Sequence, residues 1–324
     1  MATYHVLALS GGGFRGLYTA TALEILEKSA GEPLARKFDL ICGTSAGGLL
    51  ALGLANEHSA SELKKLFVDN GTSIFQNRSL PRKIFGFWWC AKHSQSGLKS
   101  SLEKIFKNTQ IGDLKHPVLI STINYSTGLF KTFKTPHHQD FSRDWELPII
   151  DAALATSAAP VYFPLFRNER GVFADGGLAA NAPGLLGVHE LKHFLGATDK
   201  DVIRVLSIGT MTKGATFSGK NLDRGFFRWR AKIFDLTISA QESLTHYMLS
   251  HTLGDNYFQI DDAITPDQSK DIDKLDNASE SAKSTLISRG DHAAQAALGD
   301  HRFKEFMHHT AAQPIFFHGP QKNG

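Results

Sequence analysis

The sequence predicts an α/β fold in which helices cover the faces of a mostly parallel sheet. A short apolar run at residues 4–9 breaks at a glycine-rich turn, and residues 16–28 then show the apolar spacing of a helix. A second apolar run at 38–42 ends at Gly43 and is followed by a helix of small residues at 46–55. Two strand–helix units in direct succession indicate parallel strands with helices packed on them.

The rest of the chain continues to alternate between strand and helix patterns. Further strands are expected at residues 118–125, 129–134, 171–174, 202–207 and 257–260. Further helices are expected at residues 60–69, 98–108, 148–156, 183–194, 231–251 and 278–288. Long irregular stretches, where lids over a site are expected, are predicted at residues 70–97 and 210–225. Since no domain boundary is visible, we predict one domain over residues 1–324, with core motifs at about 4–209 and a C-terminal helical extension at about 226–311.

Composition excludes several classes of protein. With 324 residues, 42% hydrophobic and 21% charged, the chain can bury a large core and is typical of a globular protein. The net charge of +3 gives no argument for nucleic acid as a partner. Cys42 and Cys90 cannot form a disulfide framework, and neither a secretory signal nor an apolar run of membrane-spanning length is visible. A cytoplasmic protein is therefore expected.

Ser45 lies in a G-x-S-x-G motif between a predicted strand and a predicted helix. This is the context of a nucleophile elbow, in which a sharp turn holds the serine hydroxyl at the tip of the strand. Gly43 and Gly47 suit the turn, because a side chain at either place would collide with neighbouring backbone. The alternative is a glycine-rich turn with an incidental serine, but the flanking strand and helix favour a nucleophile.

Residues 11–16, here called the glycine loop, also follow a strand and open a helix. They match the pattern G-x-G-x-x-G, which is typical of oxidoreductases that bind a nicotinamide or flavin dinucleotide. That fold needs an acidic residue at the end of the second strand to hold the ribose. The only acid in that strand, Asp39, lies near its beginning, and this argues against a dinucleotide site.

An oxyanion hole is the better interpretation of the glycine loop. Gly11, Gly12 and Gly13 would supply backbone N–H donors beside Ser45, with Arg15 nearby. Such preorganised donors stabilise the negative charge that develops on an attacked carbonyl oxygen.

A serine nucleophile needs a base. The chain has 15 histidines, but none lies in a glycine turn at a strand end, as the other motifs do. Asp175 directly follows a short predicted strand and precedes Gly176 and Gly177. A simple turn would also explain this pattern taken alone. Together with the elbow and the glycine loop, the pattern favours Asp175 as the base for Ser45.

These motifs together resemble the patatin-like phospholipase family over residues of about 4–209. Its blocks occur here in the family's order: the glycine loop, the elbow at 43–47, the segment 156–160 (Thr-Ser-Ala-Ala-Pro) and the Asp-Gly-Gly at 175–177. The resemblance implies a three-layer α/β/α fold with a central, mostly parallel sheet. It also implies hydrolysis of acyl esters in phospholipids or other lipids by a Ser45–Asp175 dyad, without a histidine, a metal or a cofactor.

Residues 13–20 resemble a bacterial branch of the family. Some members of that branch are effectors of anti-phage systems and are switched on by cyclic oligonucleotides. The resemblance implies a phospholipase A-type enzyme that acts at the membrane surface, with a cyclic dinucleotide as its activator. The activator could work by ordering a lid or by joining subunits into a homo-oligomer.

Two stretches, 82–89 and 224–230, combine aromatic and basic residues. Aromatic rings beside cations suit a lipid headgroup boundary. Arg224, Arg228 and Arg230 could equally hold an anionic nucleotide activator, since the arginine fork matches phosphate. The alternative, that the aromatic rings are core residues and the cations a solvated rim, stays open.

Two rival functions remain besides the oxidoreductase. One is an unregulated lipase or esterase that acts on neutral lipids or small acyl esters. The other is a non-catalytic module that binds lipid or nucleotide. Such a module would keep the fold and lose the serine or the aspartate, whereas Ser45 and Asp175 are both present.

Overall fold

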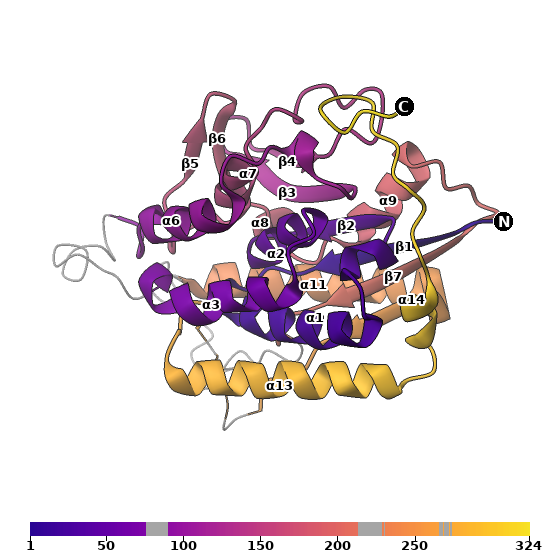
Figure 1. Ribbon diagram of the computed structural model, residues 1–324. Helices are drawn as coiled ribbons and strands as arrows, with labels where there is room; N and C mark the ends of the chain where they lie inside the picture. The colour runs from indigo at the N-terminus through magenta and orange to yellow at the C-terminus, as the bar shows by residue number, and fades with distance from the viewer. Residues whose placement is uncertain (76–89, 213–228, 230, 266–267, 269–271, 273) are drawn as a thin grey trace.

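The computed structural model describes residues 1–75, 90–212, 229, 231–265, 268, 272 and 274–324. Helices lie on both faces of a central sheet, which gives the molecule three layers (Figure 1). The predicted three-layer α/β/α fold is thereby confirmed.

The central sheet is mostly parallel, as predicted. Its strands are β1 (Thr3–Leu9), β2 (Leu40–Gly43), β3 (Val118–Asn124), β4 (Leu129–Lys134), β5 (Phe166–Asn168), β6 (Gly171–Asp175), β7 (Val202–Ile208) and β8 (Tyr257–Ile260). Their order is β5-β6-β3-β2-β1-β7-β8, with β4 paired to β3 off this path. The neighbouring strands β3-β2-β1-β7-β8 of this order pair in parallel. Strands β4 and β6 run antiparallel to β3, and β5 runs antiparallel to β6.

The helices divide between the two faces of the sheet (Figure 1). One face carries α8 (Gly177–Ala180), α9 (Gly184–Phe194) and α11 (Ala231–Leu253). The other carries α1 (Gly16–Ala30), α2 (Ala46–Ala55) and α7 (Ile149–Thr156), with α3 (Ala60–Phe75), α6 (Gln95–Phe106) and α13 (Glu280–Gly299) packed outside them. The short α14 (Lys304–His308) follows α13, and no helix of the described ranges is long and apolar enough to cross a membrane.

The core lies on both sides of the sheet because successive strand residues point to opposite faces. In β1, Val6 and Ala8 pack with α9 and α11, whereas Leu7 and Leu9 pack with α1 and α2. All four side chains are fully buried. A strand that is apolar on both faces is what a parallel sheet covered on both sides requires.

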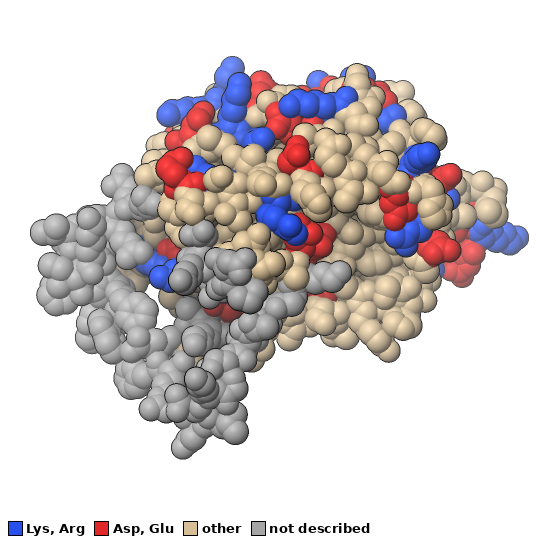
Figure 2. All heavy atoms as spheres, turned by 90° about the horizontal axis from the view of Figure 1, so that it is seen from below, with Lys and Arg blue, Asp and Glu red and all other residues tan. Residues whose placement is uncertain are grey.

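Basic and acidic side chains are interspersed on the side of the molecule that carries α13 (Figure 2). Lys28 and Lys64, for example, both pair with Glu24. Over the described part of this side, charge of both signs is therefore mixed, in keeping with the small net charge of +3.

Most elements lie where the sequence predicts them, and residues 46–55, 129–134 and 257–260 match the observed bounds. The predicted bounds of the irregular stretch at 70–97 are wrong at both ends, because α3 continues to Phe75 and α6 already begins at Gln95. Within that stretch, residues 76–89 lie outside the described ranges, as do 213–225 of the stretch at 210–225. The elements β5, α8 and α14 were not predicted from the sequence.

The predicted C-terminal extension packs closely on the rest of the chain. β8 pairs with β7 in the central sheet, and α13 lies along α1 (Figure 1). At the crossing of α13 and α1, a Cβ on Gly290 would lie 2.5 Å from the backbone oxygen of Tyr18. The helices therefore touch backbone to backbone at this glycine, and we propose that residues 1–324 fold as one domain.

We expect Gly290→Ala to lower the stability of the whole domain. The added methyl group must push α13 away from α1, and overpacking of this kind costs about 1–3 kcal/mol. Thermal unfolding should remain a single transition and move to lower temperature. The matched control is Gly299→Ala at the end of the same helix, where no atom lies within 4 Å of the added Cβ. Two separate transitions, with only one of them shifted, would contradict a single domain.

Candidate active site

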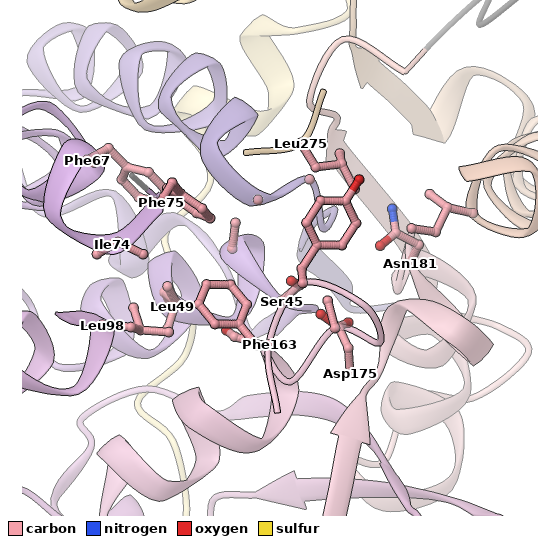
Figure 3. Close-up of a pocket in the computed structure, with 18 of the residues that line it drawn as sticks. Ser45, Leu49, Phe67, Ile74, Phe75, Leu98, Phe163, Asp175, Asn181 and Leu275 are labelled. Carbon is pink, nitrogen blue, oxygen red and sulfur yellow. The ribbon is translucent and has the colours of Figure 1, made fainter. Parts of the chain in front are cut away.

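The sequence motifs meet at one edge of the central sheet. β1 and β2 are parallel and aligned, with Leu9 opposite Gly43, so the glycine loop and Ser45 leave the sheet side by side. β6 runs antiparallel to β3 and brings its last residue, Asp175, opposite Thr122. Ser45 and Asp175 thus lie close together (Figure 3). In α/β folds, the carboxyl ends of parallel strands are where ligands usually bind.

Ser45 has the backbone geometry of a nucleophile elbow. Its dihedral angles are φ 51° and ψ −125°, a region that residues other than glycine rarely adopt. A Cβ on Gly47 would lie 2.2 Å from the carbonyl oxygen of Leu9, so the helix that follows can approach β1 only with glycine there. The strained turn presents the Ser45 hydroxyl at the tip of β2, as the motif predicts.

The carboxyl group of Asp175 is buried next to the serine. Its Oδ1 accepts a hydrogen bond from the Gly177 N–H at 2.6 Å, and the Ser45 side chain lies beside it, where hydrogen bonding to Ser45 acts on the pKa of the carboxyl group. Burial raises the pKa of Asp175 to about 7, although both hydrogen bonds act to lower it. A carboxylate with a pKa near neutrality is a stronger base than an exposed aspartate, and it is only partly ionised at pH 7.

The segment 156–160 fixes the backbone of both residues. Thr156 Oγ1 accepts the Ser45 N–H at 2.8 Å and donates to the carbonyl oxygen of Ser121 at 2.7 Å. The carbonyl oxygen of Ala158 accepts the Asp175 N–H at 3.0 Å. The family block Thr-Ser-Ala-Ala-Pro therefore ties the elbow and the aspartate to one short piece of chain after α7.

Two N–H groups of the glycine loop are free to act as donors. Gly12 and Gly13 line the same pocket as Ser45, and neither N–H has an acceptor among the described residues. The carbonyl oxygen of Gly12 accepts the Arg15 N–H at 3.1 Å, and Gly13 has a positive φ of 58°. The loop thus turns backbone donors toward the pocket, which is what an oxyanion hole requires.

The structure corrects two parts of the predicted oxyanion loop. The N–H of Gly11 donates to the carbonyl oxygen of Asn181 at 3.1 Å, so it is not available to a substrate. The side chain of Arg15 is buried and does not line the pocket. Burial lowers the pKa of its guanidinium, and the nearby carboxyl groups act to raise it, chiefly that of Glu242. Arg15 balances buried acids here, and its side chain is not an oxyanion donor.

An apolar pocket extends from Ser45 toward α3 and α6 (Figure 3). It encloses about 740 Å³, counting the part that is open to solvent. Its walls come mainly from helices α2, α3 and α11 and from residues 157–163 after α7. Its large apolar side chains are Leu49, Leu66, Phe67, Ile74, Phe75, Leu98, Phe163, Phe234, Ile238 and Leu275. A pocket with this apolar lining suits a flexible hydrocarbon chain whose polar end lies at Ser45.

No histidine lines this pocket within the described ranges. His93 is buried behind the pocket wall, where its ring packs on Phe75 and Phe163. Its Nε2 contacts Asp276 at 2.7 Å, so it pairs with an acid away from the serine.

Sequence reasoning left several residues of the site without a firm role. Asn181 is buried beside Gly11, and Phe234 and Ile238 of α11 form one wall of the pocket. The four-residue spacing from 234 to 238 marks one face of the predicted helix. Spacing alone could not show which part of the fold this face contacts. The residues predicted to contact lipid or activator, 82–89 and Arg224, Arg228 and Arg230, lie outside the described ranges.

Comparison with known proteins agrees with this geometry. The family described as Patatin-like phospholipase matches residues 7–185, which include the elbow, the glycine loop and Asp175. The chain is 62% identical over 322 residues to a protein of Pseudomonas aeruginosa named cGAMP-activated phospholipase, covering 99% of this chain and 97% of that protein. Proteins of the same name from Escherichia coli (36% identity, covering 96% and 94%) and Vibrio cholerae (37%, covering 88% of each) are also similar. The chain therefore belongs to the patatin-like phospholipase family and is an enzyme that hydrolyses esters.

Proposed function

We propose that this enzyme is a phospholipase A-type serine hydrolase in which Ser45 is the nucleophile and Asp175 its general base. The observation that carries the proposal is that the Ser45 side chain and the buried Asp175 carboxyl group lie side by side at the mouth of an apolar pocket. A nucleophile in hydrogen-bond contact with its base is the arrangement that covalent catalysis needs.

In the proposed reaction, Asp175 takes the hydroxyl proton as Ser45 Oγ attacks the acyl carbonyl carbon. The N–H groups of Gly12 and Gly13 stabilise the oxyanion of the tetrahedral intermediate. When the intermediate collapses, the carbon–oxygen bond to the alcohol breaks, and Asp175 returns the proton to the departing lysolipid. Asp175 then deprotonates a water molecule that attacks the acyl carbon, the bond from that carbon to Ser45 Oγ breaks, Asp175 returns the proton to Ser45 Oγ, and the fatty acid leaves.

The raised pKa of Asp175 explains how a carboxylate can replace histidine as the base. With a pKa of about 7, Asp175 is close to the pKa range in which histidine works. General bases are most effective when their pKa lies near the working pH. Burial is the cause of the shift, so the same apolar surroundings that receive the acyl chain also make the aspartate basic.

We propose that the substrates are membrane phospholipids, reached from the cytoplasm by an enzyme that associates with the membrane surface when active. The apolar pocket supports an acyl chain as the recognised group, because its lining is apolar along its length. An unregulated lipase for neutral lipids would use the same pocket. Comparing phospholipid vesicles with triglyceride emulsions as substrates separates the two.

We expect Ser45→Ala to abolish fatty acid release from phospholipid vesicles, with a loss of about 10³-fold or more. The substitution removes the nucleophile but leaves the elbow, the pocket and Asp175 in place. Release of fatty acid can be followed by mass spectrometry, and labelling by a fluorophosphonate probe should vanish in parallel. The control is Ser101→Ala in α6, which removes another buried hydroxyl, one that donates to the carbonyl oxygen of Gly97. A Ser45→Ala enzyme with wild-type turnover would rule out this mechanism.

We expect Asp175→Asn to remove activity and yet to stabilise the fold above neutral pH. The pKa of Asp175 is raised in the folded protein, from 3.8 to about 7, so the folded state favours the protonated form. Stability from this group is therefore complete below pH 4 and is lost as the pH rises through 7. Asparagine mimics the protonated acid, so the variant should melt at a higher temperature than wild type at pH 8 and at nearly the same temperature at pH 4.

Asp276→Asn is the control, because its expected change in melting temperature at pH 8 has the opposite sign. Asp276 pairs with Lys92 and His93, and these partners lower its pKa to about 2 even though burial alone would raise it. Its ionised form stabilises the fold above pH 4, so its removal should lower the melting temperature at pH 8. Destabilisation of Asp175→Asn at pH 8 would contradict the buried, proton-binding aspartate.

We propose further that a cyclic dinucleotide activates the enzyme in anti-phage defence. Support comes from three relatives named cGAMP-activated phospholipase, one of them 62% identical over nearly the whole chain. A cytoplasmic phospholipase endangers its own cell's membrane, so a resting state with little activity is expected. For activation, the ligand must bind the active arrangement more tightly than the resting one.

We expect cGAMP to raise fatty acid release by the wild-type enzyme about 10-fold or more, in line with ordinary coupling energies between sites. Calorimetry should show that Ser45→Ala binds cGAMP as tightly as the wild type but stays inactive. A linear dinucleotide of the same bases serves as the control ligand. Full activity without any nucleotide, together with no cGAMP binding, would leave the unregulated lipase as the better description.

A further inference from the structure

The peptide group between Gly11 and Gly12 is fixed by hydrogen bonds to its carbonyl oxygen. In a planar trans peptide, the carbonyl of one residue and the N–H of the next point in opposite directions, so fixing one fixes the other. The carbonyl oxygen of Gly11 accepts two hydrogen bonds, from Thr210 Oγ1 at 2.9 Å and from Asn181 Nδ2 at 3.2 Å. These two side chains therefore set the direction of the Gly12 N–H, the proposed oxyanion donor.

The carboxamide of Asn181 is itself held by α11. Its Nδ2 also donates to Glu242 Oε1 at 2.7 Å, and its main-chain N–H donates to the side chain of Gln241. Only the NH₂ group of a carboxamide can donate to a carboxyl oxygen, so Glu242 keeps that group turned toward Gly11. Asn181 and Glu242 are almost fully buried, which removes water as a competing partner.

Glu242 lies on the face of α11 that also contacts the pocket. Phe234, Ile238 and Glu242 are spaced by four residues, so they lie on one face of the helix. A buried carboxyl group lowers stability unless its interactions compensate for the lost water. Burial also raises the pKa of Glu242 to about 7. Charged or neutral, the group keeps an oxygen that can accept from Asn181.

We propose that Glu242 is a positioning residue for the oxyanion hole, which acts through Asn181 on the direction of the Gly12 N–H. The inference rests on the proposed function, because it assumes that Gly12 stabilises the oxyanion formed when Ser45 attacks. Hydrogen bonds weaken steeply as their angle departs from linearity, so a tilted peptide loses much of its effect. Removal of one oxyanion donor costs about 10²–10³-fold in kcat, which sets the upper bound for a tilted one.

The test compares Glu242→Leu with Glu242→Gln. Leucine keeps the bulk but removes the acceptor, whereas glutamine keeps an oxygen that accepts from Asn181. The measurements are kcat and KM on a soluble p-nitrophenyl ester, with and without cGAMP, and the affinity of a trifluoromethyl ketone whose hydrated form mimics the tetrahedral intermediate. Glu242→Leu should lower kcat and inhibitor affinity by the same factor, about 10-fold or more, with KM unchanged. Glu242→Gln should restore most of both.

Two further variants keep the test decisive if Glu242→Leu folds poorly. Thr210→Val removes the other donor to the Gly11 carbonyl with little change of shape, and it should also lower kcat and inhibitor affinity in parallel. Ser243→Ala changes the exposed neighbour of Glu242 on α11 and should behave as the wild type. Melting temperatures of all variants separate loss of fold from loss of alignment.

Several results would overturn the inference. Unchanged kcat and inhibitor affinity in Glu242→Leu, or a change in KM or melting temperature alone, would reduce Glu242 to a structural role. An equal loss in Glu242→Gln would mean that its charge matters and not its acceptor. Full activity of Ser45→Ala would refute the proposed function and this inference with it. An inactive Ser45→Ala beside an unaffected Glu242→Leu would refute this inference alone.

Discussion

The proposed active site depends on the burial of one carboxyl group, that of Asp175. Asp175 lies in surroundings that disfavour its charged form, and this raises its pKa to about 7. The hydrogen bonds from Gly177 and Ser45 limit the shift, so the carboxyl group can still ionise near neutral pH. An apolar pocket, a tight turn after β6 and a serine within hydrogen-bond reach are all needed together. A more exposed aspartate would be a weak base, and a fully isolated one would stay protonated.

Much of the site is built from backbone groups that are themselves held by hydrogen bonds. The Ser45 N–H is held by Thr156, the Asp175 N–H by the carbonyl of Ala158, and the Gly11 carbonyl by Asn181. Backbone donors fixed in this way need little reorganisation when charge develops during the reaction. The strain at Ser45, with its positive φ, is stored in the same framework. Glycine is required in the loop and the elbow because an added side chain would collide with neighbouring atoms, and at Gly13 also because φ is positive.

The sequence predicted the parts of the site that are local in the chain. Ser45 and the glycine loop follow two neighbouring parallel strands, whose carboxyl ends a parallel sheet brings together. Asp175 is also a short motif at a strand end, but it reaches the same place from β6, which runs antiparallel to β3. Arg15 was misplaced because the local sequence pattern does not show that this side chain is buried away from the pocket. The roles of Asn181 and Thr210 follow from contacts across 170 and 199 residues of sequence. The end of α3 was missed because Asn70 and Gly71 suggest a loop, whereas Gly71 packs against Phe14.

Helix α11 contacts both the apolar pocket and Asn181, so a movement of this helix would affect both. Phe234 and Ile238 form a wall of the apolar pocket, and Glu242 on the same face contacts Asn181, which in turn contacts the glycine loop. Successive residues of a helix are about 100° apart around its axis, since there are 3.6 residues per turn. A rotation of α11 by a single residue step would therefore withdraw the wall and the carboxyl group in one movement. Rotation of α11 would therefore change the wall of the pocket and the alignment of the proposed oxyanion donor at the same time.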